Sequence, residues 1–348
     1  MLFNVCALYI KIMNNENQTI HKSDDNLTIY GWNEKLNQLK QESIYSTLAH
    51  GRVSIVHRTC YEVISGNGLF QCELTGNMMY GKSDDELPCT GDWVIFQPFD
   101  EHKGIIVDRL PRERTLYRKK SGTVADKQAI ASYVDKAFIV QSLDDNFNVR
   151  RVERFMVQIM EENISSVLVL NKADLDFDRQ SVEEQIKHIS SQIPVFFTSI
   201  HQPETIVRLR KSISEGETVV FVGSSGVGKS SLVNALCEKP VLLTSDISLS
   251  TGKGRHTSTR REMVLMDSSG VLIDTPGVRE FGLAIDNPDS LAEVLEISDY
   301  AELCRFKDCK HINEPGCAVI EAVNSGALDS KVYASYLKLR REAWHFSA

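Results

Sequence analysis

Two different patterns of hydrophobic and polar residues follow one another along the chain. From Gly51 to about Arg109, apolar and polar residues alternate in short runs bounded by Gly, Asp and Pro, which predicts strands with one buried face. The predicted strands are GRVSIVHRTC, YEVIS, LFQCELTG, DWVIFQP and GIIVDRL. We expect a small antiparallel β-barrel of the OB type over residues 45–112. The strand pattern alone leaves open whether this barrel is a purely structural module or binds nucleic acid.

After residue 113 the strands become continuous apolar runs that alternate with helical segments. The predicted strands are AFIVQS, SSVLVLNKADL, IPVFFTSI and TVVFVGSSG, and the predicted helices are RRVERFMVQIMEEN, SVEEQIKHISSQ, TIVRLRKSI and KSSLVNALC. Continuous apolar strands are typical of a mostly parallel sheet whose two faces are covered by helices. The pattern therefore predicts a doubly wound α/β domain over residues 113–286.

The two ends of the chain follow neither pattern. Residues 1–44 are interpreted as an N-terminal extension that is loose up to about Asn26. Its apolar start, MLFNVCALYIKIM, is much shorter than the roughly 20 residues that span a bilayer, so we expect no membrane anchor. Residues 287–348 are predicted to form a mainly α domain.

Composition narrows the class of protein without identifying a function. The chain has 348 residues, of which 42% are hydrophobic and 25% charged, a size and balance typical of a globular protein with two or three domains. A net charge of -8 excludes a uniformly basic surface but allows local basic faces. Only the last three of the eight cysteines cluster, which favours a reducing compartment over a disulfide framework.

A basic segment, RLPRERTLYRKKSG, joins the barrel to the α/β domain. Its positive residues are Arg109, Arg112, Arg114, Arg118, Lys119 and Lys120. The run is either a solvated linker or a surface that contacts a phosphate backbone, because clustered Lys and Arg supply sequence-independent affinity for nucleic acids.

The segment GSSGVGKS, Gly223 to Ser230, fits the phosphate-loop pattern between a predicted strand and a predicted helix. Backbone N–H groups of such a loop surround phosphate oxygens, Lys229 reaches the outer phosphates and takes part in catalysis, and Ser230 holds Mg2+. The expected nucleotide contacts in this loop are Gly223, Ser224, Ser225, Gly226, Val227, Gly228, Lys229, Ser230 and Ser231. A phosphate loop alone does not separate ATP from GTP.

The segment NKAD points to guanine. Asp174 can accept hydrogen bonds from the N1 and N2 donors that adenine lacks, Asn171 is expected at the other base edge, and Lys172 is expected along the ring. NKAD ends a predicted parallel strand, where ligands of doubly wound sheets bind. Ser199 ends the next strand and is assigned a second contact to the base, although Ile200 stands where an alanine is usual.

Two further segments resemble the switches of a GTPase. In VLIDTPGVREFG, Asp274 is the expected partner of Mg2+, and the N–H of Gly277 is expected to reach the γ-phosphate during catalysis. The preceding loop, LSTGKGRHTSTRR, is interpreted as the first switch, in which Thr257, or alternatively Thr259, closes over the metal and γ-phosphate.

The order of these segments is permuted, because NKAD precedes the phosphate loop. A fold whose ends lie close together tolerates being joined there and opened elsewhere. We therefore predict a circularly permuted GTPase domain with an intact nucleotide site.

A cluster of metal-binding residues follows this domain. Cys304, Cys309, His311 and Cys317 form a C-x4-C-x-H-x5-C pattern, which suits one structural Zn2+ held by three thiolates and an imidazole. Unligated cysteines in a helical domain are the alternative, and another thiophilic metal also remains open.

The chain resembles the family of circularly permuted GTPases called ribosome small subunit-dependent GTPase A. The resemblance runs from about Gly31 to the C-terminus and includes YGWNEKL, TGDWV, NKADL, GVGKSSLVNAL, GKGRHTST, DTPGVREFGL and CRFKDCKHINEPGCAV. It implies a bacterial cytoplasmic GTPase that binds the small ribosomal subunit and its rRNA late in maturation and is stimulated by that subunit. We expect a monomer that binds GTP and GDP with Mg2+ and contacts no membrane.

The sequence departs from a Ras-like pattern at Val278, where a glutamine would orient the attacking water. An apolar side chain cannot do so, and another group must position the water. We assign this role to His256, to which the family resemblance also points; contact with RNA or solvent only is the alternative for this residue.

Two other classes of function compete with a ribosomal GTPase. A phosphate-loop ATPase or kinase would leave NKAD without a role. A GTP-gated binding protein with a non-ribosomal protein partner would use the barrel and the cysteine cluster as docking modules, which the acidic net charge mildly favours.

Overall fold

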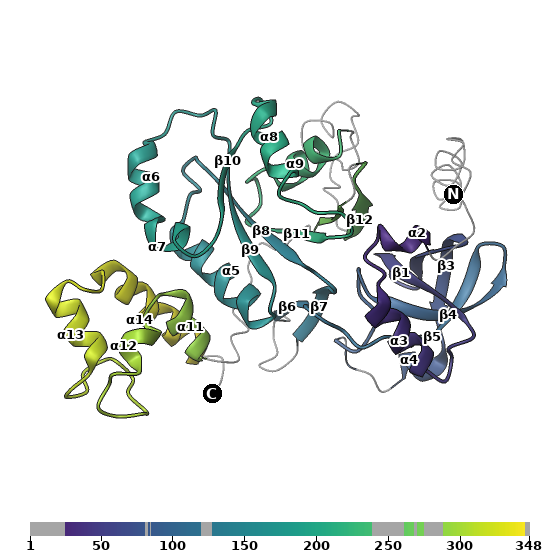
Figure 1. Ribbon diagram of the computed structural model, residues 1–348, viewed down its shortest axis with the longest axis horizontal. Coiled ribbons are helices and arrows are strands. Elements are labelled where there is room, and N and C mark those ends of the chain that lie inside the picture. Colours follow the sequence, from purple (N-terminus) through teal and green to yellow (C-terminus); the bar gives the residue numbers. More distant parts are fainter. Residues whose placement is uncertain are drawn as a thin grey trace.

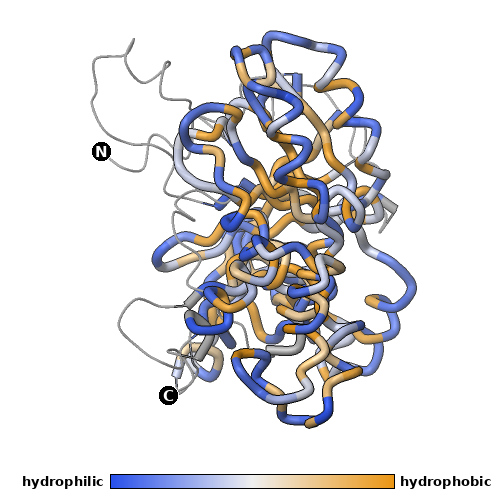
Figure 2. Tube along the Cα trace, turned by 90° about the vertical axis from the view of Figure 1, so that its left-hand side faces the viewer, coloured by the Kyte–Doolittle hydropathy of each residue, from blue (hydrophilic) through white to orange (hydrophobic). Residues whose placement is uncertain are grey.

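The computed structural model describes residues 25–80, 83, 85–119, 127–238, 261–267, 270–274 and 288–344. Figure 1 shows a barrel on one side, a central sheet with helices, and a group of C-terminal helices on the other side. Apolar segments run through the interior of the trace, and the outermost turns are mostly hydrophilic (Figure 2). Within the described part of the chain, we find no helix with the length and apolarity needed to cross a membrane.

The barrel has the OB topology that the strand pattern predicts. Its strands are β1 (Ala49–Val56), β2 (Tyr61–Ser65), β3 (Gly68–Leu74), β4 (Trp93–Asp100) and β5 (Lys103–Arg109). They pair in the order β1-β2-β3-β5-β4 and close through β1 and β4, with only β3 and β5 parallel. A bulge in β1 between Val53 and Ile55 lets this strand bend and pair on both sides. The short helix α4 (Gly76–Met79) lies between β3 and β4 and contributes Met78 to the barrel core.

Two helices of the predicted N-terminal extension pack on the barrel. They are α2 (Asp25–Thr28) and α3 (Glu34–Glu42), and Leu27, Trp32 and Leu36 share a core with Trp93 of β4. Asn33 caps α3 by accepting a hydrogen bond from the N–H of Leu36 at 3.1 Å. These helices thus precede the first predicted strand.

The central sheet confirms the predicted α/β architecture. Five strands, β8 (Lys136–Ser142), β9 (Ser165–Asn171), β10 (Val195–Thr198), β11 (Thr218–Val222) and β13 (Val271–Asp274), run parallel in the order β10-β9-β8-β11-β13. β12 (Glu262–Leu265) is antiparallel to β13. The carboxyl ends of the parallel strands therefore meet at one edge.

Alternate residues of these strands enter two separate cores. Ile139, Leu168 and Val220 face the core that contains α5 (Val149–Glu161), α6 (Arg179–Gln185) and α7 (Lys187–Ser190). Phe138 and Phe221 face the core that contains α8 (Pro203–Arg210) and α9 (Lys229–Leu236). Helices on both faces explain why the strands read as continuous apolar runs.

The barrel continues the central sheet. β12 pairs with β13 on one side and with β1 on the other, where Ile55 lies opposite Glu262, so that eleven strands form one sheet. The sequence analysis did not predict β12 or this pairing. A two-stranded ribbon, β6 (Leu116–Lys119) and β7 (Lys127–Ala131), connects the two parts along the chain.

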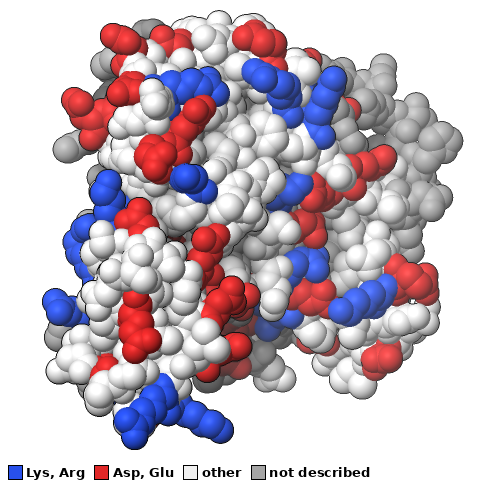
Figure 3. Space-filling view, turned by 60° about the vertical axis from the view of Figure 1, so that its left-hand side comes forward, with Lys and Arg blue, Asp and Glu red and all other residues white. Residues whose placement is uncertain are grey.

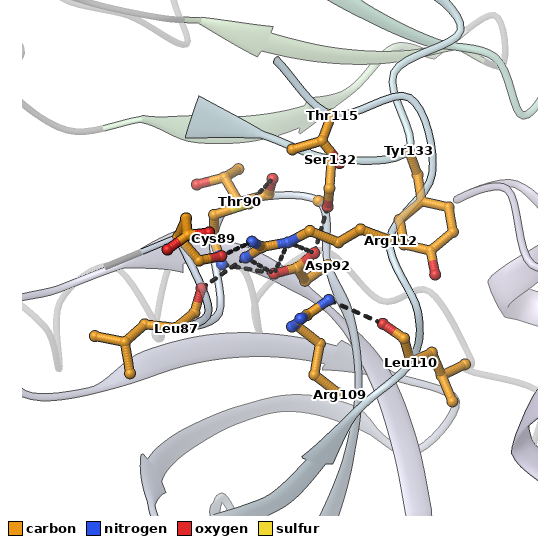
Figure 4. Close-up of polar contacts among 12 residues, drawn as sticks. Leu87, Cys89, Thr90, Asp92, Arg109, Leu110, Arg112, Thr115, Ser132 and Tyr133 are labelled. Carbon is orange, nitrogen blue, oxygen red and sulfur yellow. Dashed lines mark hydrogen bonds and ion pairs between the residues drawn. The ribbon is translucent and has the colours of Figure 1, made fainter. Parts of the chain in front are cut away.

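Two buried arginine side chains stabilise the junction between the barrel and the central sheet. Arg112 donates to both carboxylate oxygens of Asp92, with Nη2 at 2.6 Å from Oδ2, and to the carbonyl of Leu87 at 2.6 Å (Figure 4). Asp92 also accepts from Ser132 Oγ at 2.6 Å and from the N–H of Cys89 at 2.8 Å. Burial opposes the charge of Arg112, but hydrogen bonding to Asp92 raises its pKa above the ordinary value. This residue of the basic segment is therefore bound inside the protein.

A second arginine crosses the junction from the barrel. Arg52 of β1 is 1% exposed, and its guanidinium donates to the Gly91 carbonyl and to Thr218 Oγ1 of β11, both at 2.9 Å. It also reaches the carbonyls of Ser132 and Tyr133, at 3.5 Å and 3.3 Å. Burial lowers the pKa of Arg52 to about 10, which leaves it charged at neutral pH. The two parts of the protein thus share a hydrogen-bonded arginine as well as a sheet.

The C-terminal helices pack on the α5 side of the sheet. They are α11 (Pro288–Val294), α12 (Ser298–Ala301), α13 (Ala318–Ser325) and α14 (Ser330–Trp344). α11 lies against α5 and α14 (Figure 1), and Leu291, Val319 and Leu339 belong to the same core as α5. The predicted mainly α character of this region is confirmed for the residues described.

Candidate guanine-nucleotide and metal sites

The phosphate loop lies between β11 and α9, as the sequence predicts. Gly223, Gly226 and Gly228 have φ values of +151°, +83° and +94°, in the region that favours glycine. A Cβ atom on Gly228 would lie 2.3 Å from Asn171 Nδ2, and one on Gly223 would lie 2.4 Å from the Val140 carbonyl. Glycine is therefore required at both ends of the loop by its neighbours as well as by its backbone.

Lys229 folds back over this loop. Its Nζ donates to the carbonyls of Gly223 and Ser224 at 2.8 and 2.9 Å. The ammonium group is thus already held at the loop, and phosphate oxygens can replace these carbonyl contacts without a large movement. This position fits the predicted role of Lys229 at the outer phosphates.

Two predicted ligands of Mg2+ lie together beside the loop. Asp274 ends β13 and is buried, and its Oδ2 lies 3.4 Å from the hydroxyl of Ser230 in the first turn of α9. A carboxylate and a hydroxyl at this separation are a donor set that suits a hard cation. The arrangement fits Mg2+ on grounds of geometry and chemistry.

The NKAD segment and Ser199 meet at the same sheet edge. Asp174 Oδ1 accepts a short hydrogen bond from Ser199 Oγ, which also accepts from the N–H of His201 at 3.0 Å. This bond from Ser199 lowers the pKa of Asp174. Thr205 supports the turn by accepting from the N–H of Ser199 at 3.0 Å. The two predicted base-contacting residues are therefore neighbours.

Asn171 connects the NKAD segment to the phosphate loop. It is 4% exposed, its Nδ2 donates to the Val227 carbonyl at 2.8 Å, and its Oδ1 accepts from Thr198 Oγ1 at 3.3 Å. The sequence analysis expected Asn171 at the base edge and did not predict this contact. The side chain fixes the distance between two parts of the site that are far apart in the sequence.

Lys172 is held by a carboxylate that the sequence analysis missed. Its backbone has φ +61°, and its Nζ lies 2.8 Å from Asp144 Oδ2. Asp144 also accepts from Ser142 Oγ at 2.6 Å and from the N–H of Asn146 at 3.0 Å. Burial alone would raise the pKa of Asp144, but the hydrogen bonds from Lys172 and Ser142 lower it to about 2. The only sequence signal for this residue is its place directly after a buried strand.

The predicted switch residues His256, Thr257 and Gly277 lie outside the described residues, as do Thr259 and Val278. Their assignments remain predictions. The phosphate-loop, base-reading and Asp274 predictions do fall on described residues, and these are brought to one edge of the sheet.

The four predicted metal ligands converge in the C-terminal part. One ligand atom from each of Cys304, Cys309, His311 and Cys317 lies within 4.8 Å of all the others. His311 Nδ1 lies 3.5 Å from Cys304 Sγ and 3.4 Å from Cys317 Sγ. Such a compact set of three thiols and an imidazole can hold a metal ion.

The turn that presents His311 is organised by Glu314. Its carboxylate accepts from the N–H groups of Lys310, Ile312 and Asn313 at 3.0, 2.9 and 3.1 Å. The backbone bond from Ile312, with those of its neighbours, lowers the pKa of Glu314 to about 2. Tyr333 of α14 donates to the His311 carbonyl at 2.6 Å, which ties the turn to the last helix. His311 itself has φ +54°.

The parallel sheet carries a phosphate loop after β11, the NKAD segment at the end of β9 and a buried carboxylate at the end of β13. This combination defines a GTPase whose segments are circularly permuted. Residues 109–284 match the family model described as RsgA GTPase. The chain belongs to the RsgA GTPase family.

Individual relatives extend this likeness over nearly the whole chain. The chain is 74% identical over 336 residues to "Small ribosomal subunit biogenesis GTPase RsgA 1" of Bacteroides thetaiotaomicron, covering 97% of this chain and 93% of the relative. It is 38% identical over 341 residues to "Small ribosomal subunit biogenesis GTPase RsgA" of Methanosarcina acetivorans, covering 95% and 90%.

Solved structures of two other proteins have a similar fold. The crystal structure of YjeQ from Thermotoga maritima has a TM-score of 0.65 and 26% identity, covering 85% of this chain and 98% of that one. The structure of YloQ, described as a circularly permuted GTPase, has a TM-score of 0.63 at 22% identity, covering 87% and 98%, and shows the same fold.

Proposed function

We propose that this protein hydrolyses GTP to GDP and phosphate as a switch in late maturation of the small ribosomal subunit. The observation that carries the choice of nucleotide is the hydrogen-bonded pair Asp174 and Ser199 at the sheet edge that also bears the phosphate loop. The ribosomal assignment is supported by relatives named as small ribosomal subunit biogenesis GTPases, at 74% and 38% identity. We propose that the protein acts in the cytoplasm as a monomer, binds rRNA and contacts no membrane.

The proposed roles of the site residues follow from their positions. Asp174 and Ser199 bind the guanine base, the N–H groups of the phosphate loop surround the phosphates, and Lys229 neutralises charge on the outer phosphates. Ser230 and Asp274 would hold Mg2+, which would supply positive charge to offset the negative charge that develops during phosphoryl transfer. These groups bind and orient GTP, so that most of the catalytic effect is positional and electrostatic.

We propose that His256 positions the attacking water, because Val278 cannot. Thr257 completes the magnesium site, and the N–H of Gly277 contacts the γ-phosphate. Hydrolysis by the protein alone is then slow, and binding to the subunit speeds it by placing His256. A His256→Ala protein that is stimulated as strongly as the wild type would contradict this role.

We propose that Cys304, Cys309, His311 and Cys317 hold one structural Zn2+, since their ligand atoms lie within 4.8 Å of one another and three thiolates with one imidazole are a ligand set of structural zinc sites. The proposed parts of the chain are an extension over residues 1–44, a barrel over 45–112, the GTPase domain over 113–286 and the zinc-binding helices over 287–348. The barrel and the zinc-binding helices lie on opposite sides of the central sheet (Figure 1).

On the face in Figure 3, positive and negative side chains are interspersed, so RNA binding has to rely on local basic groups.

GTP turnover with and without purified small subunits tests this function, with large subunits and a salt series as controls. We expect strong stimulation by small subunits only, and ATP should not compete. Slow turnover without stimulation would keep the GTPase activity and remove the ribosomal partner. The alternative of a GTP-gated protein with a non-ribosomal partner would then take its place.

A further inference from the structure

A cluster of polar side chains lies beside the phosphate loop. It involves the hydroxyl of Ser224, whereas the role proposed above for this loop is carried by its backbone N–H groups. Ser224 Oγ accepts hydrogen bonds from Asn146 Nδ2 at 3.1 Å and from Arg151 Nη1 at 3.0 Å. Arg151 Nη1 also lies 3.1 Å from Asn146 Oδ1 and 3.2 Å from the Asn146 carbonyl. The cluster is partly buried and joins three side chains from two distant segments.

Local structure fixes both donors. Asn146 follows β8, and Asp144 holds the turn by accepting from its N–H at 3.0 Å. Asn148 caps α5 by accepting from the N–H of Arg151 at 3.1 Å, so the arginine starts from the first turn of the helix. Neither donor depends on a long flexible loop for its position.

The place of Arg151 in the helix is electrostatically unfavourable on its own. The first turn of a helix carries partial positive charge and favours acidic residues, yet this turn contains Arg150 and Arg151 and no acidic residue. A cation held there against a loop that binds phosphate gains a favourable partner when an anion occupies the loop. The geometry thus points to the bound nucleotide as the group that Arg151 complements.

Two cations meet at Ser224. Lys229 Nζ donates to its carbonyl at 2.9 Å, and Arg151 Nη1 donates to its hydroxyl at 3.0 Å. Because GTP carries more negative charge than GDP, positive charge added beside this loop favours GTP over GDP.

We propose that Arg151 is a positioning residue that acts through Ser224 and biases the phosphate loop toward GTP. This inference rests on the proposed GTPase function and adds a determinant of nucleotide preference to it. Asn146 assists by orienting the guanidinium, and Asp144 links the same turn to Lys172 of the base-reading segment at 2.8 Å. One short turn after β8 thereby connects the two halves of the nucleotide site.

The test compares dissociation constants of the full-length protein for fluorescent GDP and for a non-hydrolysable GTP analogue, both with Mg2+. Replacement of Arg151 by Ala should weaken binding of the GTP analogue about tenfold, the size of one hydrogen bond to a charged group, and binding of GDP by less. Arg151→Lys should restore most of the preference because it keeps the charge. Arg150→Ala is the matched control, since Arg150 is exposed in the same turn and should leave both constants unchanged.

A double-mutant cycle separates action through Ser224 from a general loss of stability. If Arg151 acts through Ser224, then Arg151→Ala in a Ser224→Ala background should change the GTP-to-GDP preference much less than in the wild type. The inference would be overturned if Arg151→Ala weakened the binding of GDP and of the GTP analogue equally. It would also be overturned if Arg151→Lys did not restore the preference for the GTP analogue over GDP. A wild-type protein that binds no guanine nucleotide would instead overturn the proposed function.

Discussion

Single residues of the phosphate loop are constrained by neighbours from other segments. Gly228 is the clearest case, because its φ of +94° and its closeness to Asn171 both exclude a side chain. The sequence pattern predicted this glycine from the loop alone. It did not predict Asn171 as the neighbour, because the two come together only in the folded sheet, where β8 lies between β9, which ends at Asn171, and β11, which precedes the loop.

Gly228→Ala should abolish tight GTP binding and lower the affinity for GTP by well over about tenfold. The added Cβ must displace Asn171 in addition to straining the backbone. Equilibrium binding of a fluorescent GTP analogue measures the loss. Gly326→Ala is the control: Gly326 ends α13 with φ +78°, and a Cβ there would meet no atom within 4 Å. Gly326→Ala strains only the backbone at its own position, so this variant should keep its affinity for GTP. Equal GTP affinities of the two variants would contradict the steric explanation.

Asp144→Asn should lower the free energy of unfolding by about 1 kcal/mol at neutral pH, after a discount for solvent screening of its ion pair with Lys172. The pKa of Asp144 in the folded protein is about 2, below its unfolded value, so this carboxylate stabilises the protein fully only above about pH 4. The difference between wild type and variant should then shrink as pH falls towards 2. Urea denaturation at several pH values measures it, and a pH-independent difference would argue against the ion pair.

At the scale of elements, α5 links the nucleotide site to the C-terminal helices. Its first turn bears Arg151, and two residues later Glu153, which is 2% exposed, accepts from Ser335 Oγ of α14 at 2.6 Å and lies 2.9 Å from His188 Nε2 of α7. The amphipathic pattern predicted this helix within a residue or two. It gave no sign that a buried acidic residue would join three helices, since a glutamate in a helix is usually exposed.

Other elements escaped prediction for identifiable reasons. α3 is polar, with Leu36 as its one buried residue, so its apolar stripe is too short to recognise, although Asn33 offered a cap. β12 has only four residues and owes its existence to partners on both sides. The barrel strands were predictable from their alternating pattern, and the parallel strands from their continuous apolar runs.

Glu153→Ala should destabilise the contact between α5 and α14 by about 2 kcal/mol, because the buried hydroxyl of Ser335 and the ring of His188 both lose their partner. Hydrogen exchange of α14 should become faster, while that of the barrel strands should not change. Ser335→Ala removes one of these bonds and should have a smaller effect in the same direction. Unchanged exchange in α14 would show that the contact does not hold the two parts together.

At the scale of the whole molecule, the C-terminal part combines an apolar core that it shares with α5 and a compact set of predicted metal ligands. The spacing of these four residues predicted them as ligands, and the fold brings all four together. How that part sits on α5 was not predictable, because the contacts join residues more than a hundred positions apart, such as Glu153 and Ser335.

Removal of the metal should unfold the segment around His311 while the nucleotide site remains able to bind GTP, because binding free energy at such sites is largely folding free energy. We expect one zinc per chain by elemental analysis, and a loss of helical signal and thermal stability with a chelator. Cys309→Ser should lose zinc, whereas Cys60→Ser, in the barrel, should retain it. Full zinc retention by Cys309→Ser would contradict the ligand assignment.

The pairing of β1 with β12 means that the barrel is not an interchangeable attachment. A flexible linker alone would let the barrel be exchanged for another domain without changing the central sheet. Here any replacement would have to offer a strand edge that matches Ile55 opposite Glu262 and an arginine that reaches Thr218. Replacement of the barrel should therefore fail unless β1 is kept, together with its contacts to β12 and to Thr218.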